Sequence, residues 1–97
     1  MITPEHIEEA ISFERERIVA AITAAADELR AAELADAERM YYADPGSYTY
    51  RTAVRDGQRA RAGAEVVELL CRHLGGSPAG SRVPDHIRRF WDDPEGF

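Results

Sequence analysis

The sequence predicts an all-α fold in which a long antiparallel helical hairpin is followed by a short C-terminal helix. Two segments, residues 4–42 and about 49–74, repeat apolar or small residues every three or four positions, which is the spacing of one helical face. The segment 43–48 between them contains Pro45 and Gly46, two residues that favour a turn. Because such a hairpin buries only one stripe per helix, we expect identical chains to associate into a helical bundle.

The size and charge of the chain exclude several classes of protein. It has 97 residues, enough for one small domain, and a formal net charge of −6. An acidic surface does not suit a general nucleic-acid coat, so a nucleic-acid partner is not expected. A single cysteine excludes a disulfide framework. No apolar run approaches the ~20 residues of a membrane span, which predicts a cytoplasmic protein without a membrane partner.

All twelve basic residues are arginine, and the chain contains neither lysine nor asparagine. This bias follows from the codons of a high-GC genome, such as that of an actinobacterium or a phage. The arginine content alone therefore does not indicate phosphate binding.

The first helix is expected to begin at Thr3 and Pro4, because Thr caps free N–H groups and Pro suits the first helical position. A narrow, coiled-coil-like apolar seam then runs along the helix. Glu14 lies on this seam, where it either sits at the open end of the hairpin or pairs with an arginine such as Arg82. The functional alternative is a polar contact that fixes the register of an oligomer or touches a ligand. The seam consists of Ile7, Ile11, Ile18, Ile22, Ala25 and Leu29.

The second helix is expected to be capped by Ser47 or Thr49 and to end before Gly75. The first half of its stripe carries small residues, which allow a neighbouring helix to approach closely. Its second half is apolar almost all round and is therefore predicted to be the centre of the core. The stripe consists of Tyr50, Ala53, Gly57, Ala60, Ala64, Val67, Cys71 and Leu74.

The remaining residues form a flexible linker, 75–82, and a short amphipathic helix with a tail, 83–97. Ile87, Phe90 and Trp91 make one apolar face of this element. That face either folds back over its own hairpin or docks onto another molecule, and the sequence leaves both arrangements open.

The sequence contains no arrangement that indicates catalysis. His6, His73 and His86 lie in three separate segments, and Cys71 falls on the core stripe, where a buried, inert thiol is expected. A pair such as His6 and Glu9 supplies too few ligands for zinc. We therefore expect neither an enzyme, nor a metal site, nor a cofactor.

Tyrosines and arginines gather around the turn and form the candidate binding region. A ladder of three arginines follows four tyrosines. Tyr faces can stack on a ligand, and Arg side chains can bind phosphate or carboxylate groups in a fork. The region consists of Tyr41, Tyr42, Tyr48, Tyr50, Arg51, Arg55 and Arg59.

These observations predict a non-catalytic helical interaction module, an accessory, inhibitor or regulatory protein that binds a protein partner. The alternative is an oligomer that binds an anionic small molecule, such as a nucleotide, between the arginine ladders of several chains. A nucleic-acid-binding regulator is a third and weaker hypothesis, because the first helix is strongly acidic.

Overall fold

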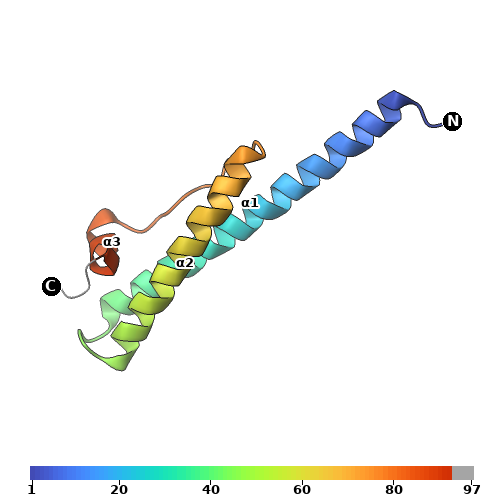
Figure 1. The fold of residues 1–97 in the computed structure, drawn as a ribbon. Helices are drawn as coiled ribbons and strands as arrows, with labels where there is room; N and C mark the ends of the chain where they lie inside the picture. The colour runs from blue at the N-terminus through green and yellow to red at the C-terminus, as the bar shows by residue number, and fades with distance from the viewer. Residues whose placement is uncertain (93–97) are drawn as a thin grey trace.

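The computed structural model describes residues 1–92, and within them it contains three helices. They are α1 (Pro4–Tyr42), α2 (Tyr48–His73) and α3 (Asp85–Asp92). Helices α1 and α2 form a long antiparallel hairpin, and α3 lies beside its closed end (Figure 1). The predicted all-α hairpin with a short C-terminal helix is therefore confirmed.

Local capping fixes where the two long helices begin. The hydroxyl of Thr3 accepts a hydrogen bond from the backbone N–H of His6 at 3.3 Å, and the His6 ring accepts one from the N–H of Thr3. At the second helix, Ser47 rather than Thr49 is the cap, and its hydroxyl accepts from the N–H of Tyr50. The turn before it uses a positive φ of 80° at Gly46.

The face of α1 that packs against α2 is not the isoleucine seam. The buried and half-buried residues repeat at alternating spacings of four and three, which is the period of a helix-packing stripe. The packing of the N-terminal part of the seam was predicted wrongly, because Ile7, Ile11 and Ile18 are half or more exposed, whereas Ile22 and Leu29 are half-buried. The stripe that does pack consists of Val19, Thr23, Ala26, Arg30, Glu33, Ala37 and Met40.

On α2 the predicted small-residue stripe does face the interior. Ala53, Gly57, Ala60, Ala64 and Cys71 are all buried. The expectation that the C-terminal half of α2 forms the centre of the core is wrong. Only one face of that half meets α1, and the side chains on its other faces reach solvent. These are Val66, Leu69 and Leu70, with Leu74 following the helix.

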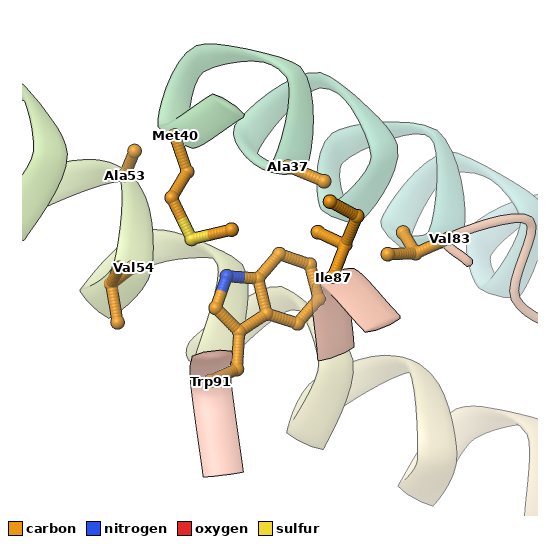
Figure 2. Packing of buried hydrophobic residues seen from close by; sticks show 7 residues of the cluster. All are labelled: Ala37, Met40, Ala53, Val54, Val83, Ile87 and Trp91. Atoms are coloured by element: carbon orange, nitrogen blue, oxygen red, sulfur yellow. The ribbon is translucent and has the colours of Figure 1, made fainter. Parts of the chain in front are cut away.

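The core lies instead at the closed end of the hairpin, around Trp91. The indole is 1% exposed and lies among the core residues that Figure 2 shows. It packs over Gly57, where an added Cβ would come within 2.6 Å of the ring. The tail thus folds back onto its own hairpin, and Ile87 and Trp91 belong to the core rather than to an accessible surface. The side chain of Phe90 and residues 93–97 lie outside the described part of the chain.

Polar contacts hold α3 against the middle of α2. The side-chain amide of Gln58 donates a hydrogen bond to the backbone carbonyl of Trp91. One turn further along, the Arg61 guanidinium pairs with Asp92 at 2.7 Å. Both contacts join α2 to the last turn of α3, so they fix where the indole enters the core.

A buried ionic network ties the middle of the hairpin together and was not anticipated from the sequence. Arg30 on α1 donates to both carboxylate oxygens of Glu68 on α2, at 2.8 and 2.5 Å, and to Glu33 at 3.0 Å. The second oxygen of Glu33 accepts from the Ser81 hydroxyl at 2.6 Å. The network therefore joins both helices to the linker that leads to α3, and each buried carboxylate has a donor.

The network shifts the titration of its members. Hydrogen bonds from Arg30, opposed by burial, hold the pKa of Glu68 below its ordinary value of 4.5. Nearer the turn, burial raises the pKa of Asp36 above 3.8, and its pairing with Arg39 at 3.2 Å only partly offsets this effect. Acid therefore weakens the Arg30–Glu68 contact, whereas it relieves the cost of burying the Asp36 carboxylate.

Replacing Gly57 with Ala should loosen the closed end. The new methyl group would overlap the Trp91 ring, so we expect a loss of about 1–3 kcal/mol in the free energy of unfolding. Thermal unfolding followed by Trp91 fluorescence measures this loss, together with a red shift of the emission.

Gly63→Ala is the matched control, because a Cβ there would meet Leu29 at an ordinary 3.7 Å. This variant should gain up to about 1 kcal/mol from helix propensity. Equal stability of the two variants, with unchanged Trp91 emission in both, would contradict the packing of α3 onto Gly57.

Replacing Glu68 with Gln should remove a pH-dependent contribution to the free energy of unfolding. Because the folded pKa of Glu68 lies below 4.5, its contribution is complete above that pH and is lost as the pH falls through the folded value. We expect Glu68→Gln to cost roughly 1–2 kcal/mol at neutral pH and progressively less in acid. Urea unfolding of both proteins between pH 7 and 3 tests this. Asp36 is common to both proteins, so a difference that stays constant in acid would exclude Glu68 as its source.

Candidate functional site

The open end of the hairpin exposes a helical segment against which no other helix of residues 1–92 packs. Helix α1 has 39 residues and α2 has 26, so α1 extends beyond α2 by about 20 Å. We call residues 4–18 of α1 the overhang. Its place at the N-terminal end of α1, beyond the end of α2, is clear in Figure 1.

Helix α2 stops where the next residues must pack closely on α1. Gly75 adopts a φ of 91°, and a Cβ on Gly76 would lie 3.0 Å from Val19 and 2.5 Å from the sulfur of Cys71. Both glycines are thus required by the local geometry, and they turn the chain away at the level of Val19. The overhang begins immediately beyond this point.

The overhang has one acidic and one apolar face. The stripe of α1 that packs against α2 continues into the overhang as Glu5, Glu9, Ser12 and Glu16. A longer α2 would therefore meet carboxylates. The apolar seam lies further round the helix, and this change of face accounts for the uncovered isoleucines.

The apolar face forms one side of a groove that also includes the end of α2. Ile7, Ile11 and Ile18 line it and are 52%, 58% and 50% exposed. Leu74 closes one end of the groove and is also exposed. We call this the open-end groove. Its lining residues are Ile2, His6, Ile7, Ala10, Ile11, Glu14, Arg15, Ile18, Val19 and Leu74.

The large exposed apolar side chains of the described residues gather at this end of the molecule. Apart from three tyrosines near the turn, all of them belong to the first 18 residues or to the last part of α2. They are Met1, Ile2, Ile7, Ile11, Phe13, Ile18, Val66, Leu69, Leu70 and Leu74. A surface of this kind, with polar residues at its rim, marks an interaction site in soluble proteins.

Glu14 lies at the rim of the open-end groove and is not buried. Its side chain is about half exposed and accepts a hydrogen bond from Arg17 at 2.9 Å. Of the two interpretations that the sequence left open, the structure shows the pairing with an arginine at the open end. The partner is Arg17, one turn along the same helix.

The four tyrosines of the predicted Tyr/Arg region differ in how far they are exposed. Tyr41, Tyr42 and Tyr48 are exposed, whereas Tyr50 is partly buried against the core. The rings of Tyr41 and Tyr42 meet edge to face with centroids 5.2 Å apart. Tyr41 and Tyr50 also line a pocket with His86 of α3, so part of this region contributes to packing at the closed end.

The arginine ladder lies on the exposed side of α2. Arg51, Arg55 and Arg59 all reach solvent. The Arg55 guanidinium is 3.4 Å from the carboxylate of its neighbour Asp56, which Arg39 also approaches at 3.6 Å. The pocket that holds Tyr41 and Tyr50 is not lined by any of the three ladder arginines. The three ladder arginines therefore lie on the surface outside this pocket.

The described residues contain a buried thiol and no cluster of potential metal ligands. The Cys71 sulfur is buried and lies 3.1 Å from the Thr23 hydroxyl. Among residues 1–92, no three potential ligands from His, Cys, Asp and Glu lie close enough together to hold a metal ion. In the same range, no helix has both the length and the apolar character required to cross a membrane.

The open-end groove could have been predicted from the unequal lengths of the two expected helices, although not from the pattern of apolar residues alone. The expected lengths of the two helices differ by more than a dozen residues, so part of the first helix must lie beyond the second. The seam spacing showed that Ile7, Ile11 and Ile18 share a face. It could not show that α2 packs on a different face.

Comparisons of the chain with protein-family models, with curated proteins and with solved structures find no match.

Proposed function

We propose that the chain is a non-catalytic protein-interaction module that binds its partner in the open-end groove. The observation that supports this most is the row Ile7, Ile11 and Ile18, which is half or more exposed on a part of α1 that no other described helix covers. Burying apolar surface stabilises a complex by about 25 cal/mol per Å². An amphipathic helix packed along the groove would bury this row.

The shape of the groove favours a protein rather than a small ligand. It follows a helical face over more than three turns, from His6 to Val19, and is open to solvent. Pockets for small molecules enclose most of the ligand and direct several polar groups at it. Here the polar groups, Glu14 and Arg15 among them, belong to an exposed helix. An extended apolar segment of another chain suits this geometry best.

The alternative, an anionic ligand held by Arg51, Arg55 and Arg59, has less support. These side chains project from successive turns of α2 into solvent, and Asp56 competes for the middle one. A small anion would need ladders from several chains to gain enough charge-assisted hydrogen bonds.

Site-specific photo-cross-linking tests the proposed function. Benzoylphenylalanine is placed at Ile7, in the open-end groove, and at Tyr48, an exposed position near the turn. After irradiation in cells, we expect protein adducts from position 7 and none from position 48. Mass spectrometry of the adducts identifies what is attached.

An adduct with any protein at position 7, including a second copy of the chain, agrees with the proposal. Adducts from position 48 alone would move the interaction to the tyrosines and arginines of the turn. The absence of protein adducts from both positions would contradict the proposal.

A further inference from the structure

We infer that the occupant of the open-end groove is a second copy of this chain, with the two overhangs packed antiparallel about a two-fold axis. This inference rests on the proposed function and names its partner. In a two-fold interface the same surface contributes twice, so the overhang must be complementary to itself in shape and in charge. Both requirements can be examined in the residues around the groove.

The apolar face satisfies the first requirement. With an axis between residues 12 and 13, two residues on the apolar faces lie opposite each other when their numbers add to about 25. Ile7 of one chain therefore lies opposite Ile18 of the other. Ile18 lines the same groove as Leu74, so the first turns of the second chain would cover the end of α2 as well. Each overhang would then occupy the space that the other chain's α2 leaves free.

The charges beside the groove satisfy the second requirement. Glu8 and Arg15 are seven residues apart, so they lie one above the other on the same flank of the isoleucine face. Antiparallel packing about this axis brings each Glu8 near the Arg15 of the other chain, and the pair forms twice. Parallel packing would instead place Arg15 near Ala10 on the opposite flank, with no ion pair.

The remaining charges stay in water in this arrangement. Glu5, Glu9 and Glu16 lie on the acidic face, away from the isoleucines. Two copies that pack through their apolar faces therefore keep these carboxylates on the outside. The acidic face explains why the overhangs pair through a single face rather than aggregate further.

Glu14 is the one polar residue on the line between Ile11 and Ile18. In the antiparallel dimer it lies opposite Ile11 of the second chain and enters the interface already paired with Arg17. It weakens the interface, because its carboxylate then faces an isoleucine.

Sedimentation equilibrium tests this dimer with a matched pair of variants. Ile11→Glu puts a charge into the interface, whereas Phe13→Glu puts the same charge about 160° away round the helix. Both residues are exposed in the single chain, at 58% and 65%. We expect a dimer for the unchanged protein and for Phe13→Glu, and a weakening of dimerisation by about a hundredfold for Ile11→Glu.

Circular dichroism and Trp91 fluorescence are the control for folding. Both should be unchanged in Ile11→Glu, because the core lies at the closed end of the hairpin. Glu14→Leu supplies a gain-of-binding test. Removing the polar residue should tighten the dimer about tenfold or more. A dimer that persists in Ile11→Glu, or that weakens in Glu14→Leu, would overturn the inference.

The register is tested by cross-linking with a short bismaleimide. A mixture of Glu8→Cys and Arg15→Cys chains should give a mixed dimer, and Glu8→Cys alone should give none. Cross-linking of Ala10→Cys chains to Arg15→Cys chains, the pair that parallel packing brings together, would show a parallel dimer and overturn the inference.

Failure of this inference differs from failure of the proposed function. If the chain remains monomeric at all concentrations but gives adducts with another protein from position 7, the dimer is excluded and the proposed function as an interaction module stands. A monomer that gives no adducts removes both.

Discussion

The packing of Trp91 onto Gly57 is the contact on which the arrangement of the molecule depends. A hairpin interface built from alanine buries little apolar area for each residue, so the largest side chain of the described chain supplies much of the closed core. The indole N–H is buried and finds no acceptor among the described residues. An unmet donor of this kind costs about 1–3 kcal/mol, and the burial of the ring must exceed that cost. Because α3 is used at this end, the isoleucines at the other end remain uncovered.

Most of the secondary structure could be predicted because its signals are local. Thr3, Ser47 and the Gly75 turn act within a few residues of the helix ends that they define. The packing face of α1 could not be predicted from apolar spacing, since two of its positions carry Arg30 and Glu33. These become packing residues only because Glu68 lies opposite, and a contact between distant residues has no signature in the spacing of either helix.

The candidate site was predicted less well than the fold. The spacing of the arginines on α2 gave their exposed side correctly, but helical angles do not tell which side chains from other elements join them. Tyr50 packs against the core, and Ile87 and Trp91 belong to it. Residues that were predicted to bind a ligand or partner therefore contribute to folding. Three of the isoleucines assigned to the seam, Ile7, Ile11 and Ile18, are instead exposed. An apolar seam on a helix identifies residues that are expected to pack against something. Whether they pack within their own chain or on another molecule depends on where the seam lies relative to the core.

The unequal lengths of the helices also set how stability is distributed along α1. Hydrogen bonds near Ala37 and Met40 are protected by the core, whereas those of residues 4–18 are backed by no tertiary packing within one chain. A helical segment of about fifteen residues is marginal in water when nothing packs on it. Amide exchange is therefore expected to be faster along residues 4–18 than in the helix around Ala37 and Met40. Binding a partner would order the same residues that form the binding surface, so that helix formation and recognition are linked in one equilibrium.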